Sequence, residues 1–192
     1  MTPLHTVELP DTQFVEEDPR KPLSYQVQIT NATVYGFENT TITKVKSDVK
    51  QKKVELYGRI PSLVGKTRSS VHARIIAGYY NASGQAIAEL QNFRFIIKAY
   101  LVVTNRRFLK LYKVFVNTKI DRAIFDVTDV HTYNSDFAIV VNQWMNENWQ
   151  EIWTEFEPII KSVISEYFIE YVNNKLTSLQ ARYDDFFLPE NE

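Results

Sequence analysis

Histidine and acidic residues are the side chains whose types could support catalysis or metal binding in this chain. The three histidines lie far apart in the sequence and lack the spacing of metal ligands: His5, His72 and His131. His72 falls on the polar side of an alternating segment, where a solvated or singly bonded imidazole is expected. Nothing in the sequence positions a nucleophile or a partner acid near the acidic pairs Asp126/Asp129 and Asp184/Asp185. We therefore predict a protein that is not an enzyme and that uses no metal and no cofactor.

Motifs of common enzyme classes do not occur in the sequence. There is no G-x-S-x-G, H-E-x-x-H, phosphate-binding loop or dinucleotide fingerprint. The chain has no cysteine, which excludes disulfides and thiolate catalysis within it. Glycosylation sequons stand at Asn31, Asn39 and Asn81, about as many as chance would supply, so they are weak evidence for secretion.

The net charge of −1 argues against nucleic acid as a partner and against a general attraction to acidic membranes. Basic residues are concentrated between Lys44 and Arg74 and between Arg94 and Arg122, where they largely alternate with apolar residues. We interpret them as solvated strand faces rather than as a phosphate-binding patch. No apolar run reaches the roughly 18 residues of a transmembrane helix.

One long amphipathic helix is predicted from Ser135 to Leu176, because its apolar residues recur at steps close to the helical period. Pro158 lies inside it, and we expect a bend there rather than an end, since proline removes one backbone donor. A helix of roughly 35 to 40 residues would span about 55 Å, which is long for a compact domain. The rest of the chain is therefore expected to cover this helix.

Apolar and polar residues alternate along much of the chain before the helix, which predicts six or seven half-buried strands. Pro61 is expected to end one strand, and residues 81–84 to close a hairpin. The apolar phase slips by one residue near Gln91 and Asn92, which predicts a β-bulge there. A turn is predicted at residues 105–107.

These elements predict an α+β fold in which a strongly curved antiparallel β-sheet wraps around one long carboxy-terminal α-helix. The expected arrangement is an elongated single domain over residues 1–192. Residues 1–22 would form an extended lead-in, 23–130 the strands, 135–176 the helix, and 177–192 a tail that docks back. A flat sheet could cover only one side of so wide an apolar helix face, so a curled sheet is the economical solution.

A helix rich in aromatic residues and wrapped by a sheet can leave an elongated apolar gap, filled either by side chains or by a ligand. Asn142 and Asn146 are the polar anchors that we expect such a ligand to meet. An alternating strand has two faces, so the choice of lining residues in the sheet is open at this point. The predicted apolar lining consists of Val141, Met145, Trp149, Ile152, Phe156, Val163, Tyr167, Phe93, Phe95, Tyr112 and Val114.

Several segments resemble the signature of the insect takeout and juvenile-hormone-binding family. Met145–Ile152 (MNENWQEI) is similar to the family's L-N-E-N-W-x-E run on its long helix. Glu157–Ile160 and Tyr183–Phe187 are similar to its L-K-P-x-I and P-Y-D-E-L-F segments. In the first half of the chain, Val34–Asn39 and Ile60–Leu63 resemble the family's V-x-G-L-x-N and V-P-x-L segments.

The resemblance implies a super-rolled sheet around a long carboxy-terminal helix, related to the tubular lipid-binding proteins. It also implies a secreted carrier that transports a juvenile-hormone-like terpenoid, a fatty acid or a related lipid in haemolymph or sensory tissue. The family begins with a signal peptide, a cysteine pair and a first helix, all of which we expect this chain to lack. The alternatives are a protein-interaction or structural module with a fully packed interior, and a truncated paralogue without function.

Overall fold

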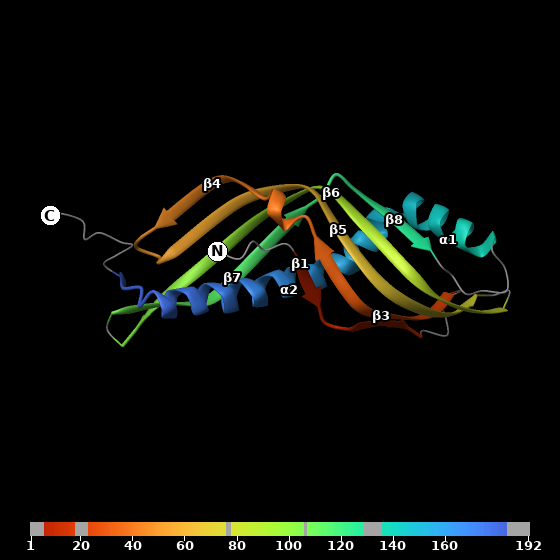
Figure 1. Ribbon diagram of the computed structural model, residues 1–192, viewed down its shortest axis with the longest axis horizontal. Helices are drawn as coiled ribbons and strands as arrows, with labels where there is room; N and C mark the ends of the chain where they lie inside the picture. Colours follow the sequence, from red (N-terminus) through yellow and green to blue (C-terminus); the bar gives the residue numbers. More distant parts are fainter. Residues whose placement is uncertain (1–5, 18–22, 76–77, 106, 129–135, 184–192) are drawn as a thin grey trace. The chain divides into compact units, whose positions relative to one another are not determined.

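The computed structural model describes residues 6–17, 23–75, 78–105, 107–128 and 136–183 (Figure 1). Within them the eight named strands form one antiparallel sheet, and two helices follow the strands in the chain. This confirms the predicted α+β class with an antiparallel sheet and a long carboxy-terminal helix. In chain order the elements are β1 (Thr6–Leu9), β2 (Thr12–Glu16), β3 (Leu23–Tyr35), the 3₁₀ turn η1 (Phe37–Asn39), β4 (Thr41–Asp48), β5 (Lys53–Ile75), β6 (Gly78–Thr104), β7 (Phe108–Lys119), β8 (Arg122–Thr128), α1 (Asp136–Glu147) and α2 (Trp149–Ser178).

The chain divides into two compact units, which are described separately. Unit 1 comprises residues 1–40, 60–93 and 120–153, and unit 2 comprises residues 41–59, 94–119 and 154–192. The long elements β5, β6 and α2 therefore contribute residues to both units.

In unit 1, the segment predicted as an extended lead-in forms strands of the sheet. β1 pairs with the end of β3, and β2 pairs with its first half, both antiparallel. Pro10 separates β1 from β2, and the hydroxyl of Thr12 donates to its carbonyl oxygen at 3.1 Å. Proline lacks the donor that a continuous ladder needs, so one extended segment becomes two short strands.

The predicted phase slip in β6 is confirmed. Asn92 has a φ of +52°, and Leu90 and Phe93 are both buried although they are an odd number of residues apart. β6 pairs with β8 as far as Gln91 and with β7 from Arg94 onward. The extra residue at this point keeps the apolar side chains before and after it on the buried side of β6.

Two predicted strand ends are wrong. β5 continues through Pro61. Its pairing with β4 ends at Arg59 and its pairing with β3 begins at Val64, so Pro61 lies in the gap between these two ladders. Pro61 thus occupies a stretch where its missing N–H removes no ladder hydrogen bond to β3 or β4. Residues 81–84, predicted as a hairpin, lie inside β6, which begins at Gly78. The turn predicted at residues 105–107 is confirmed by a hydrogen bond from Arg107 N–H to Thr104 O at 3.1 Å.

The predicted single helix is interrupted at Asn148, which separates α1 from α2. The Asn148 side-chain amide donates to Trp144 O at 2.8 Å, and the Asn148 backbone N–H reaches the same oxygen at 3.0 Å. A side chain that bonds the carbonyl four residues earlier competes with the helical backbone pattern. Pro158 lies inside α2, which continues through it as predicted.

In unit 2, strand registers determine which side chains share a face of the sheet. Phe95, Ile97 and Ala99 of β6 pair with Thr118, Val116 and Val114 of β7, so these six share one face. We call it the inner face, because Ile97, Ala99 and Val116 are buried. Leu109 and Leu111 of β7 are also buried. Side chains that point the other way form the outer face.

Candidate functional site

The apolar side of α2 is the strongest candidate for a ligand-binding surface. All 30 residues of α2 belong to the described part of the chain, and none of them is buried. Phe156, Ile160 and Val163 fall within about 60° of one another on a helical projection, and each is half-buried. Tyr167 continues this stripe and is 38% exposed. In a fully packed interior such residues would be buried, so this stripe is incompletely covered by protein.

Polar contacts on both flanks of this stripe hold α2 against β7 within unit 2. The Asn173 side chain accepts from Leu111 N–H and donates to Leu111 O, each at 2.9 Å. The Thr118 hydroxyl donates to the Glu157 carboxylate. Glu157 and Asn173 lie on opposite sides of the Phe156–Tyr167 stripe at about 100° per residue. Because both reach β7, the stripe between them faces the inner face of the sheet.

The Glu157 carboxylate is a half-buried acid with two partners. Burial raises its pKa, but the hydrogen bond from Thr118 and the ion pair with Lys161 together outweigh that effect. The Lys161 Nζ lies 2.9 Å from Glu157 Oε1. The pKa of Glu157 is therefore lowered from 4.5, and the carboxylate stays ionised at neutral pH. Its contacts give it a structural role at the edge of the apolar stripe.

On the sheet side of unit 2, Phe95 belongs to the inner face and Tyr112 does not. The Phe95 ring covers Gly58 of β5 so closely that a Cβ atom at position 58 would collide with it. Tyr112 occupies a register shift opposite Tyr100 and Leu101, is 57% exposed, and contacts the Tyr100 ring at a centroid distance of 6.5 Å. Tyr100 points away from Ile97 and Ala99, so Tyr112 belongs to the outer face and was assigned to the wrong side. The sequence carried no sign of this shift in β7.

In unit 1, the predicted lining residues Met145, Trp149 and Ile152 are half-buried, whereas Phe93 is only 1% exposed. Phe93 meets Trp153 edge-to-face at a centroid distance of 6.5 Å. Such a geometry is favourable for aromatic pairs and makes Phe93 a core residue. The side chain of Val141 lies outside the described part of the structure.

The expected polar anchors Asn142 and Asn146 bind the backbone of β8 and hold α1 beside it (Figure 1). Asn146 accepts from Phe125 N–H at 2.9 Å and donates to Phe125 O at 2.7 Å. Asn142 does the same with Val127, at 2.7 and 3.1 Å. Four residues of helix rise about 6 Å and two residues of strand about 6.6 Å, so the spacings match. Both amides are engaged by protein, which corrects the prediction that they wait for a ligand.

Replacing Asn146 by alanine should loosen α1 from β8, because the N–H and C=O of Phe125 lose their partner. We expect a loss of about 1 to 3 kcal/mol in unfolding free energy and faster hydrogen exchange at the Phe125 and Val127 amides. Gln143→Ala is the control, since the exposed Gln143 amide donates to exposed Glu147 on the same helix at 2.8 Å. Equal stability of the two variants would contradict the assigned role of Asn146.

The residues considered for catalysis have structural partners or lie outside the description. His72 Nδ1 lies 2.8 Å from Asn81 Oδ1, and Asp126 contacts the Asn142 amide at 3.5 Å. His5, His131, Asp129 and the pair Asp184/Asp185 lie outside the described residues. The described residues contain no group of three or more His, Asp or Glu side chains able to hold a metal ion. Among the same residues, no helix is long and apolar enough to span a membrane.

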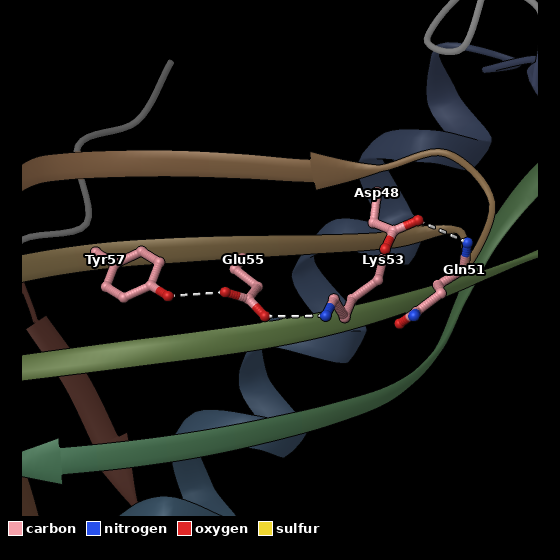
Figure 2. A network of polar contacts seen from close by, with 5 residues as sticks. All are labelled: Asp48, Gln51, Lys53, Glu55 and Tyr57. Carbon is pink, nitrogen blue, oxygen red and sulfur yellow. Dashed lines mark hydrogen bonds and ion pairs between the residues drawn. The ribbon is translucent and has the colours of Figure 1, made fainter.

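A charged network lies near the turn between β4 and β5 (Figure 2). Gly58 of β5 lies against the inner-face ring of Phe95, so Lys53, Glu55 and Tyr57, each an odd number of residues from Gly58, are on the outer face of unit 2. Glu55 is 9% exposed, accepts from the Tyr57 hydroxyl at 2.7 Å, and pairs with Lys53 at 3.1 Å. The hydrogen bond from Tyr57, followed by that from Lys53, lowers the pKa of Glu55. The same contact with Glu55 raises the pKa of Lys53. Asp48 accepts from Gln51 N–H at 2.9 Å and closes the turn.

Comparisons with known proteins agree with this architecture. A family model described as haemolymph juvenile hormone binding protein matches residues 1–188. The crystal structure of Takeout 1 from Epiphyas postvittana has a similar fold, with a TM-score of 0.71 and 19% sequence identity. That match covers 93% of this chain and 81% of the other. Comparison with curated protein sequences found no match.

Proposed function

Because the chain belongs to the haemolymph juvenile hormone binding protein family, we propose that it is a non-enzymatic carrier of a hydrophobic small molecule. The expected ligand is a juvenile-hormone-like terpenoid, a fatty acid or a related lipid. We also propose that the protein is extracellular, because its family is one of haemolymph proteins.

The observation that carries the proposal is the half-buried apolar stripe of α2 in unit 2. Phe156 and Val163 face the inner sheet face that includes Phe95 and Val114, yet no residue of the fully described helix is buried. A ligand placed between these two surfaces would complete the burial that the protein side chains leave unfinished. In unit 1, half-buried Met145, Trp149 and Ile152 are the corresponding candidates.

The driving force for binding would be the removal of apolar surface from water. An apolar ligand of about fifteen carbons gains roughly 10 kcal/mol gross at about 0.8 kcal/mol per methylene. Lost translational freedom and side-chain ordering take back several kcal/mol, which leaves micromolar to nanomolar affinity. Asn142 and Asn146 are bonded to β8 and so are not free to recognise a ligand. Ligand selectivity would therefore come from the shape and length of the binding site.

Native mass spectrometry of the protein purified from its source, followed by organic extraction, tests this proposal. We expect a bound mass that disappears on extraction, and we expect the extracted protein to take up a terpenoid or a fatty acid again. A protein free of bound mass that takes up neither class would show that the interior is closed by side chains. That result would reject the carrier proposal and favour a protein-interaction module with a fully packed interior.

A further inference from the structure

Unit 2 contains β4, β7 and the adjoining parts of β5 and β6. All charged side chains of these four strand segments lie on the outer face of the sheet. Register places Lys44 opposite Tyr57, Lys98 opposite Phe115 and Lys113 opposite Tyr100. The inner-face positions of the same segments are apolar or uncharged. The sequence presented these cations as separate alternating runs, and the pairing of the strands gathers them on one surface. The exposed cations used below are Lys44, Lys46, Lys110, Lys113 and Lys119, with half-buried Lys98 among them.

The acidic residues of this outer face do not neutralise these lysines. Within strand segments 41–48, 53–59, 94–104 and 108–119, which are fully described, the acids are Asp48 and Glu55. Glu55 is paired with Lys53 at 3.1 Å and bonded by Tyr57, while Asp48 is bonded to Gln51 N–H (Figure 2). The outer face is therefore strongly cationic although the whole chain has a net charge of −1.

Exposed aromatic rings lie among these lysines. Tyr112 and Phe115 are 57% and 46% exposed, and both contact the Tyr100 ring edge-on. The Lys113 ammonium lies 4.5 Å from the centre of the Phe115 ring, and that of Lys46 lies 5.6 Å from the Tyr57 ring. Lysine and aromatic side chains that combine an apolar body with a charged or polar end suit a boundary between water and lipid.

The spread of the lysines favours an extended anionic surface over one small anion. β4 and β7 stand three strand spacings apart in the order β4-β5-β6-β7, which is about 14 Å at about 4.8 Å per spacing. A single phosphate accepts hydrogen bonds only within about 3 Å and so could engage one edge alone. A sheet of anionic headgroups could meet all these lysines together, while the exposed rings contact the upper parts of the lipids.

We propose that the outer face of unit 2 is a docking surface for an anionic lipid bilayer. Each lysine near such a bilayer strengthens binding about fivefold, and salt screens this attraction. The inference does not depend on the proposed carrier function, because it concerns the opposite face of the sheet and a headgroup surface rather than an interior ligand.

Vesicle co-sedimentation of the full chain tests the proposal. We expect the protein to bind vesicles that contain phosphatidylserine, to release at high salt, and to ignore vesicles of phosphatidylcholine alone. The triple variant Lys44→Gln, Lys98→Gln, Lys113→Gln should bind about 100-fold more weakly. If it folds poorly in a thermal melt, Lys110→Gln with Lys119→Gln serves instead, because both side chains are exposed and Gln keeps their length.

The matched control removes three positive charges from unit 1. Lys66, Arg68 and Arg122 are exposed, and Lys66 lies 5.5 Å from the Tyr35 ring, which resembles the setting of Lys46 and Lys113. Lys66→Gln, Arg68→Gln, Arg122→Gln should leave vesicle binding unchanged. Equal losses in both triple variants would mean that net charge alone acts and would overturn the proposal. Absence of vesicle binding, or binding to soluble heparin without vesicle binding, would overturn it as well.

Discussion

A carboxylate at position 156 should abolish ligand uptake while the fold persists. Phe156→Glu places a charge on the half-buried stripe of α2 that faces the inner sheet face. Desolvating that charge beside an apolar ligand costs about 3 kcal/mol or more, so we expect at least about a 100-fold loss of affinity. Displacement of a fluorescent fatty acid, read with and without a terpenoid competitor, measures the change.

The control for this prediction adds the same charge elsewhere on the same helix. Thr154 is exposed and lies about 160° from Phe156 on the helical projection, so Thr154→Glu should bind ligand like the unmodified protein. Circular dichroism and thermal melting of both variants show whether weaker binding is due to loss of the binding surface or to unfolding of the protein. Unchanged affinity of a folded Phe156→Glu protein would remove this stripe from the binding surface.

Replacing Gly36 by alanine should produce the largest loss of stability among single glycine changes in unit 1. Gly36 has a φ of +107°, a left-handed backbone conformation that side chains strongly disfavour. A Cβ atom there would also collide with the backbone carbonyl oxygen of Ser62. Both effects act on backbone atoms that have little room to move, so we expect a loss of about 3 kcal/mol or more in unfolding free energy.

Gly65→Ala provides the comparison, because a Cβ atom at position 65 has Ala88 O at 3.9 Å as its nearest contact. That is an ordinary van der Waals distance, and Gly65 has no left-handed backbone. Urea denaturation of the two variants should therefore give clearly different midpoints, with Gly65→Ala close to the unmodified protein. Similar midpoints would show that the Gly36 turn relaxes without cost.

Several features followed from local sequence pattern alone. The two-residue alternation predicted strands in the middle of the chain, and the phase slip predicted the irregularity at Asn92, which has a φ of +52°. The helical period predicted a long apolar stripe, and the M-N-E-N-W run indicated the family that matches residues 1–188. These predictions succeeded because side-chain direction along one strand or helix depends on backbone geometry within a few residues.

Predictions that required knowledge of a distant partner were less successful. Pro61 does not end β5, because β4 and β3 leave residues 60–63 out of their pairings. Asn142 and Asn146 bond β8 rather than a ligand, and Tyr112 shifts to the outer face at a register irregularity. The break at Asn148 has a local cause instead, because its side-chain amide bonds Trp144 O four residues earlier while the apolar period continues past it.

The sequence by itself determined that this chain forms an antiparallel sheet and a long amphipathic helix, because alternation and helical period are local properties. Only the tertiary structure decided which side of each strand is inner and that scattered lysines share one outer face. Both outcomes depend on strand registers such as Lys44 with Tyr57 and Lys98 with Phe115. A register shifted by one residue would exchange the two faces, and the hydrogen bonds that set it join residues far apart in the chain.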